Sequence, residues 1–87
     1  MKLICCQNCG DTFTLILKHE RICRCGKVGG QLVDSFIIKV FGDPAVIGLD
    51  NRTLAKAIKN RPDSGRGLDF NSFIICKNNK KIIHYKK

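Results

Sequence analysis

Two close pairs of cysteines are the most distinctive feature of the sequence, as possible metal ligands or redox thiols. Cys6 and Cys9 are separated by two residues, Cys23 and Cys25 by one, and thirteen residues lie between the pairs. Zn²⁺ takes four soft ligands in a tetrahedron, with Zn–S distances near ~2.3 Å, and two short turns can supply two thiolates each. A glycine follows each pair and permits the left-handed backbone of a tight turn. The pattern predicts a structural Zn²⁺ site, because four thiolates leave no coordination position open for a substrate.

Other assignments of these thiols are weaker. A redox dithiol at Cys6 and Cys9 is disfavoured because no helical pattern follows to depress a thiol pKa. Cys5 could replace Cys6 in a C-x3-C register, but the usual spacing of a metal-binding turn favours Cys6. His19 lies in a polar stretch four residues before Cys23, and we expect it to face solvent rather than bind the metal.

Catalysis has little support in the sequence. Cys76 follows an apolar run, where a free cysteine usually behaves as a small buried hydrophobic residue. Nucleophilic catalysis by Cys76 with His84 would need an orienting group, and no Asp or Asn can be assigned to the pair by spacing. We therefore expect a protein that is not an enzyme.

The cysteine pairs resemble those of a zinc ribbon, in which two such turns sit at the ends of β-hairpins and share one metal ion. The likeness covers residues 3–30, about a third of the chain, and departs from the family in the C-x-C spacing of the second pair. Residues 23–30 (CRCGKVGG) are also similar to a group of short uncharacterised bacterial and phage proteins. That second likeness implies a phage or mobile-element origin and brings no established function.

Length and composition limit what the chain can be. It has 87 residues, 44% of them hydrophobic, and such a chain buries only about 60–65% of its unfolded surface. A bound metal would add the stability that a small core lacks. A large enzyme scaffold is excluded by length, and a transmembrane helix by the lack of an apolar run near ~18 residues. We expect a single domain over residues 1–87 and no membrane association.

The N-terminus suggests the compartment. A secretory signal needs an apolar stretch of roughly 7–15 residues, but the sequence MKLI runs directly into Cys5. We therefore expect a cytoplasmic protein. Thiols are kept reduced there, which favours metal ligands over disulfides.

The remaining pattern predicts a small α+β fold. Residues 1–30 form the expected zinc ribbon, and residues 31–87 a small antiparallel sheet with one short amphipathic helix at about 51–60. Residues 12–17, the outgoing arm of the first hairpin, and residues 35–41 are rich in β-formers. Residues 45–47 form either a strand or a core plug. Residues 68–75 are expected as a core strand, 77–80 as a hairpin turn and 81–85 as its partner strand, with the phenylalanines filling the core.

The predicted helix has two unlike sides. Asp50 or Asn51 is a plausible N-cap, and Leu54 and Ile58 form the apolar side. The cations Arg52, Lys56 and Lys59 lie on the opposite side. A solvated surface is the ordinary explanation of such a stripe, but without an acidic residue to balance it, anion binding is also favoured.

The segment after the helix is a second candidate for phosphate binding. Residues 61–67 contain Arg61, Arg66 and two glycines in one turn, which could surround a phosphate with N–H groups and guanidinium groups. An ordinary loop is the alternative. The order of residues is not that of a P-loop.

Charge is concentrated in the second half of the chain. The net charge is +9; residues 1–44 carry 6 basic and 4 acidic side chains, and residues 45–87 carry 10 and 3. The basic set there is completed by the lysines at 77, 80, 81, 86 and 87. Such a surface attracts phosphate-bearing partners. We expect a nucleic-acid-binding module; the alternatives are a phage-type inhibitor that binds an acidic host protein or sequesters a phosphorylated nucleotide, and a subunit that uses the ribbon as a docking surface.

Overall fold

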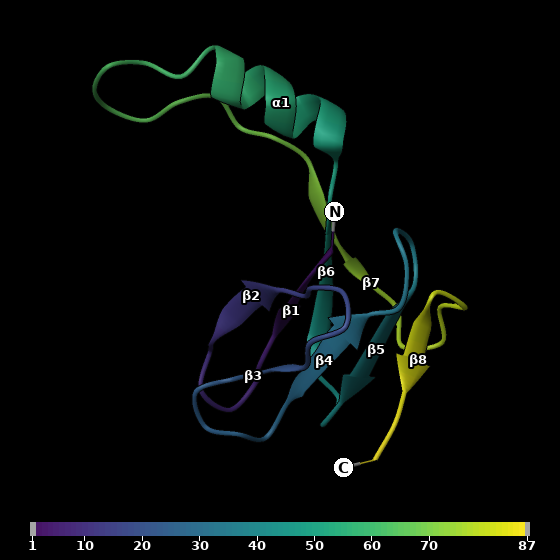
Figure 1. The fold of residues 1–87 in the computed structure, drawn as a ribbon. Helices are drawn as coiled ribbons and strands as arrows, with labels where there is room; N and C mark the ends of the chain where they lie inside the picture. Colours follow the sequence, from purple (N-terminus) through teal and green to yellow (C-terminus); the bar gives the residue numbers. More distant parts are fainter. Residues whose placement is uncertain (1, 87) are drawn as a thin grey trace.

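The computed structural model describes residues 2–86, with eight short strands and one helix (Figure 1). In chain order the elements are β1 (Lys2–Cys5), β2 (Thr12–Thr14), β3 (Arg21–Ile22), β4 (Gly29–Leu32), β5 (Ile38–Phe41), β6 (Ala45–Leu49), α1 (Asn51–Lys59), β7 (Ser72–Ile75) and β8 (Ile82–His84). The protein is therefore α+β, as predicted. None of the helical structure in residues 2–86 is long and apolar enough to cross a membrane.

The strands form two four-stranded sheets. The first has the order β2-β1-β6-β7 and is antiparallel throughout, and the second has the order β3-β4-β5-β8. Strands β5 and β8 run parallel, so the second sheet is mixed. The prediction of one small antiparallel sheet was wrong, because each N-terminal hairpin is extended by strands from the rest of the chain and becomes half of a sheet.

The core lies between the two sheets. Ile4 and Val46 of the first sheet pack with Ile38, Val40 and Ile82 of the second, and all five are buried. Strand alternation explains why Ile4 and Val46 are buried, since every second side chain of a strand points to the same side of its sheet. Residues 45–47 are therefore part of a central strand, not a plug.

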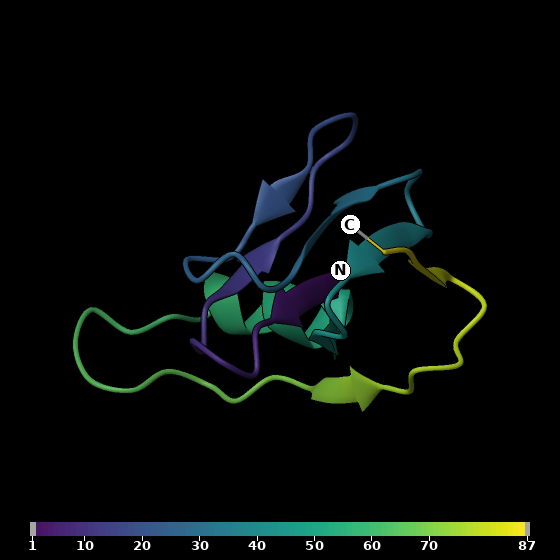
Figure 2. The same ribbon diagram turned by 90° about the horizontal axis from the view of Figure 1, so that it is seen from below.

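Helix α1 begins and ends close to its predicted limits. The Asp50 carboxylate accepts the Arg52 N–H at 3.1 Å, so Asp50, not Asn51, is the N-cap. The helix has no buried residue and projects from the sheets (Figure 1), and the loop that follows it extends to one side of the molecule (Figure 2). We call residues 50–71 the arm.

Two predicted strands are shorter than expected. Residues 12–17 supply only β2, and residues 35–41 only β5. At the second site the carboxylate of Asp34 accepts the N–H groups of Phe36 and Ile37 at 2.8 and 2.9 Å. This local turn competes with strand pairing, so β5 starts at Ile38.

The C-terminal hairpin was predicted wrongly. The Asn79 carboxamide oxygen accepts the Lys81 N–H at 2.9 Å, so a turn does form. It carries the chain from the first sheet to the second, where β8 pairs with β5 rather than with β7. Burial of Ile82 in the shared core explains this crossing, because a return beside β7 would leave that side chain outside the core.

The expectation that residues 68–75 form a core strand was also wrong. Leu68, Phe70 and Phe73 are 53%, 40% and 56% exposed, and β7 is an edge strand. Phe36 is likewise exposed, whereas Phe41 is buried. Apolar type alone does not show which segment has a second sheet to pack against.

Candidate metal centre

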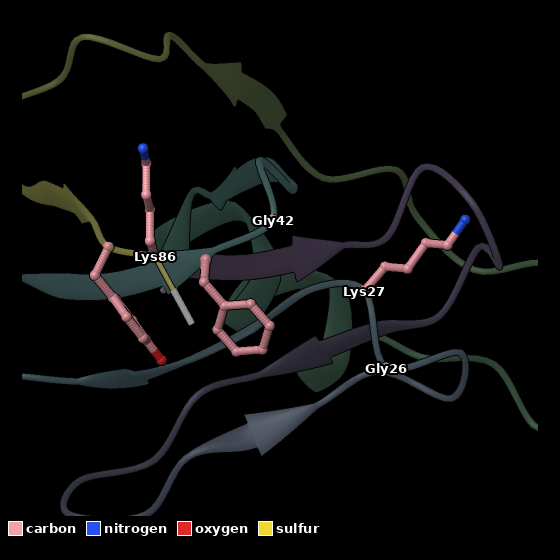
Figure 3. A pocket seen from close by; sticks show the side chains of 6 residues that line it. Gly26, Lys27, Gly42 and Lys86 are labelled. Atoms are coloured by element: carbon pink, nitrogen blue, oxygen red, sulfur yellow. The ribbon is translucent and has the colours of Figure 1, made fainter.

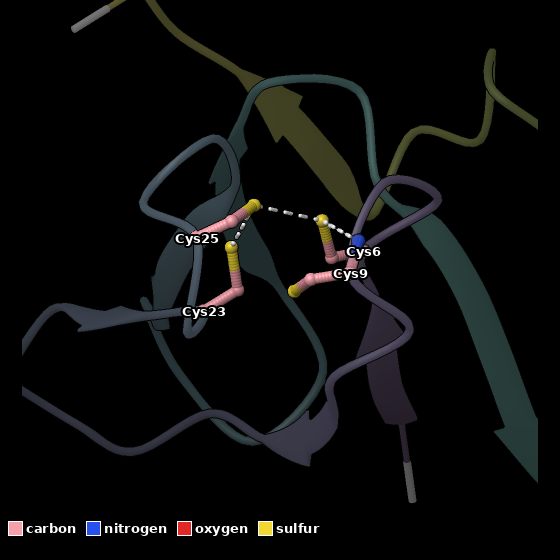
Figure 4. Close-up of side chains that lie close together, drawn as sticks. All are labelled: Cys6, Cys9, Cys23 and Cys25. Carbon is pink, nitrogen blue, oxygen red and sulfur yellow. Dashed lines mark hydrogen bonds between the residues drawn. The ribbon is translucent and has the colours of Figure 1, made fainter.

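The structure brings the four predicted ligand cysteines together. All four Sγ atoms lie within 4.8 Å of one another, with 3.6 Å between Cys6 and Cys25 and 3.5 Å between Cys23 and Cys25 (Figure 4). A tetrahedron of thiolates at ~2.3 Å from a zinc ion places its sulfurs roughly 3.8 Å apart. All six cysteines of the chain are free thiols. The donor set and its spacing therefore fit one tetrahedral metal ion.

Two similar turns present these thiols. The first joins β1 to β2, and within it the Gly10 N–H donates to the Cys6 carbonyl at 2.9 Å. The second joins β3 to β4, and there the Gly26 N–H donates to the Cys23 carbonyl at 3.0 Å. Both glycines have φ near +80°, at 76° and 81°. The glycine after each cysteine pair thus adopts the left-handed conformation that the sequence suggested.

Backbone N–H groups point at the two buried sulfurs. The amides of Asn8 and Cys9 donate to the Cys6 Sγ at 3.4 Å, and the Val28 amide donates to the Cys23 Sγ at the same distance. Donors in this position stabilise thiolates and orient them toward a shared ion. Both turns therefore direct backbone donors at the sulfurs that would bind a metal ion.

The pKa values of the two buried thiols move in opposite directions. Burial raises the pKa of Cys23, but the Val28 N–H and the Cys25 and Cys6 thiols outweigh it, and the pKa falls to about 6. The Cys9 N–H lowers the pKa of Cys6, but burial and the neighbouring thiols raise it to about 11. Closely packed thiols thus share protons, which a metal ion would displace.

Exposure differs across the cluster. Cys6 and Cys23 form a small buried cluster with Val28, separate from the core between the sheets, whereas Cys9 is half-buried and Cys25 is exposed. An ion would therefore be covered on the side of the sheets and accessible beside Cys25.

Asp11 is a structural residue that the sequence analysis missed. Its carboxylate accepts the Arg24 N–H at 3.0 Å, and its carbonyl accepts the Cys6 N–H at 2.9 Å. Asp11 therefore links the two cysteine-bearing turns directly. The sequence places Asp11 two residues after Cys9, but nothing in it indicates the hydrogen bond to Arg24, thirteen residues further along the chain.

The other candidate thiols and histidines lie outside the cluster. Cys5 Sγ lies 3.8 Å from the Cys6 carbonyl oxygen, and His19 is exposed, as expected. Cys76 is exposed, so the expectation that it is a buried hydrophobic residue was wrong. His84 Nε2 lies 3.1 Å from the Lys77 carbonyl oxygen.

The five predicted phosphate-binding residues all lie on the arm but are not equivalent. Arg52, Lys56 and Lys59 are exposed on α1, and none of them forms an ion pair within residues 2–86. Arg61 donates to the Ile58 carbonyl at 3.3 Å. Arg66 pairs with the carboxylate of Asp69, which weakens its candidacy as an anion ligand. Lys87, predicted to add to the basic surface, lies outside the described residues.

A shallow hollow near the second cysteine turn combines basic and aromatic side chains (Figure 3). It has a volume of about 480 Å³ and is lined by Gly26, Lys27, Phe41, Gly42, Tyr85 and Lys86. The Tyr85 hydroxyl donates to the Glu20 carboxylate at 2.5 Å, and the Phe41 and Tyr85 rings meet edge to face at 5.5 Å. Residues from three distant segments form this hollow, so the sequence did not predict it.

Comparison with known proteins identifies no relative. The chain matches no family model, and neither a curated protein nor a solved structure matches it significantly. The resemblance to zinc ribbons and to phage proteins therefore rests on the cysteine turns alone.

Proposed function

We propose that Cys6, Cys9, Cys23 and Cys25 hold one structural Zn²⁺ in a ribbon-like centre. Four cysteine ligands are typical of structural zinc, and the N–H groups around Cys6 and Cys23 suit bound thiolates. An ion with four thiolate ligands stabilises the fold without reacting with a substrate. The protein is accordingly a binding protein and not an enzyme.

We further propose that the binding partner is nucleic acid, contacted through its phosphate backbone by α1. The observation that carries this function is the set of three exposed cations, Arg52, Lys56 and Lys59, which have no carboxylate partner within residues 2–86. They lie on a projecting arm of a chain with net charge +9. Cations without an ion-pair partner break no salt bridge when they bind phosphate. Release of counterions from the nucleic acid then favours the interaction.

Fluorescence anisotropy with labelled DNA duplex and single-stranded RNA, measured over a range of salt concentrations, tests this function. Changing Arg52, Lys56 and Lys59 together to Ala should weaken binding. It should also reduce the slope of log affinity against log salt, by up to about 0.9 for each duplex phosphate that is no longer neutralised. The matched control replaces Lys80, Lys81 and Lys86 with Ala, which removes the same charge from exposed side chains that also have no ion pair within residues 2–86.

The comparison between the two triple variants decides the outcome. A larger drop in affinity for the helix variant supports binding through α1. Equal drops would mean that net charge alone drives association, and unchanged affinity in both would contradict nucleic-acid binding by these surfaces.

The hollow beside Tyr85 favours a second candidate function, the binding of a phosphorylated nucleotide. Lys27 and Lys86 supply positive charge at its rim, and Tyr85 supplies an aromatic surface (Figure 3). Titration calorimetry with nucleoside mono-, di- and triphosphates tests this candidate. Heat that disappears when Lys27 and Lys86 are both changed to Ala, but persists when exposed Lys18 is changed, would support it.

A further inference from the structure

The arm has an apolar side that its own chain leaves largely uncovered. On α1 this side comprises Leu54, Ala57 and Ile58, and Ile58 is 51% exposed. Leu68 and Phe70 of the following loop are 53% and 40% exposed. An isolated helix shorter than ~12–15 residues is marginal in water, so a nine-residue helix needs tertiary packing.

Hydrogen bonds at the root of the arm continue the pairing of β6 and β7 beyond Leu49 and Ser72. The Asp50 N–H donates to the Asn71 carbonyl at 3.0 Å, and the Asn71 N–H donates to the Thr53 hydroxyl at 2.8 Å. The Thr53 hydroxyl in turn donates to the Asp50 carbonyl at 3.3 Å. The arm therefore extends in line with β6 and β7 rather than over either sheet (Figure 1), which leaves its apolar side open to a partner from outside the chain.

The first sheet also has an uncovered apolar surface. Its strand register aligns Leu3, Ile47 and Ile74 in one row on the side opposite the core, and Ile74 is 70% exposed. Alternation places the following residues on the same side, which we call the outer face: Leu3, Cys5, Thr12, Thr14, Ala45, Ile47, Leu49, Ser72 and Ile74. None of these nine side chains is charged.

The two surfaces match in size and charge. Nine helical residues are ~14 Å long, five strand residues span ~17 Å, and four strands spaced ~4.8 Å apart are ~14 Å across. The cations of α1 lie on the side away from Leu54 and Ile58. A helix laid on the outer face would therefore bury apolar surface on both sides while its positive charges stay in solvent.

We propose that the chain forms a two-fold dimer in which the apolar side of each arm packs on the outer face of the other copy. Such an interface is isologous, so the same contact forms twice. A specific assembly buries at least about 1,000 Å² in total, so each of the two contacts must bury roughly 250 Å² on each of its surfaces. Leu68 and Phe70 add to this area. The dimer would display the cations of α1 twice, once from each copy. The dimer proposal does not depend on which ligand these cations bind.

Light scattering coupled to size-exclusion chromatography, with protein up to about 100 µM, tests the dimer. The wild-type chain should have twice its 9.8 kDa mass. Ile58→Asp on the arm and Ile74→Asp on the outer face should each give the monomer mass. Both side chains are exposed within the chain, so neither change should disturb the packing of the two sheets. Phe36→Asp, which alters a side chain that is 66% exposed and belongs to neither surface, should leave the dimer intact.

Mixing the two variants separates this arrangement from other dimers. The Ile58→Asp copy keeps a native outer face and the Ile74→Asp copy a native arm, so an equimolar mixture should recover part of the dimer through one intact contact. A monomeric wild-type protein would overturn the proposal. So would a dimer that Ile58→Asp leaves unchanged, because the arms would then not be involved.

Discussion

At the scale of single residues, position in the fold distinguishes the four clustered cysteines from the other two. Two of the six thiols, Cys5 and Cys76, lie outside the cluster although Cys5 is adjacent to a ligand. Strand alternation accounts for Cys5, because it lies on the outer face while Ile4 turns into the core. This difference between neighbouring thiols makes a direct test possible.

Cys9→Ser should abolish stoichiometric zinc binding and unfold the region around the cysteine turns. A structural zinc site in a small peptide supplies roughly 10 kcal/mol or more of folding free energy, so the substitution should resemble chelation. Zinc content by colorimetric release and circular dichroism with and without chelator measure the effect. The control, Cys76→Ser, alters an exposed thiol and should change stability by less than about 0.5 kcal/mol. Equal damage from both changes would mean that the ligand set is misassigned.

Titration of Tyr85 should lower the free energy of unfolding at alkaline pH. Burial and the hydrogen bond to Glu20 raise its pKa from 10.0 to about 12. The folded state therefore keeps a proton that the unfolded state loses, so this contribution is complete below pH 10 and is lost as pH rises through about 12. Tyr85 is the only tyrosine, so ultraviolet titration of tyrosinate reports its pKa directly. Urea unfolding at rising alkaline pH should show a steeper loss of stability for wild type than for Tyr85→Phe, and parallel losses would contradict the assignment.

At the scale of the elements and their turns, the distance to neighbouring backbone decides which turn positions tolerate a residue larger than glycine. Gly42, after β5, has φ +81°, and a Cβ atom there would lie 2.0 Å from the Lys27 carbonyl oxygen. Gly65, in the arm, has a similar φ of +79°, with nothing within 4 Å of the same position. The two glycines share a backbone conformation but differ in their surroundings.

Gly42→Ala should therefore destabilise the protein more than Gly65→Ala. Left-handed backbone costs each alanine roughly 1–2 kcal/mol, and Gly42→Ala must also displace the backbone around Lys27. We expect an additional destabilisation of about 1–3 kcal/mol, read from urea unfolding midpoints and slopes. If the two variants were equally stable, the approach between β5 and the second cysteine turn would not be tight.

In the molecule as a whole, the cysteine cluster and the core join the same two sheets at different places. Each sheet supplies one cysteine turn, and each supplies side chains to the core between them. Neither the hairpin of β1 and β2 nor that of β3 and β4 forms an independent ribbon, because β6 and β5 pair with their inner strands. The arm lies outside this arrangement and carries the surfaces proposed for nucleic acid and for the second copy.

Features that depend on neighbours along the chain could be predicted from the residues alone. Cysteine spacing and the glycines after each pair specified the two turns, and Asp50 with the following apolar and cationic residues specified α1. These features need only local backbone geometry and one short-range hydrogen bond each. The convergence of the four thiols followed from the preference of one ion for four ligands.

The sheet that each apolar segment joins, in contrast, is decided only by the tertiary structure. Residues 72–75 and 82–84 have similar composition, yet β7 is exposed at an edge and β8 buries Ile82 beside β5. Hydrophobic burial is non-directional, so an apolar strand can pair with any sheet edge that completes a core. The choice depends on which distant segment presents that edge, and this information is absent from the residues around the strand itself.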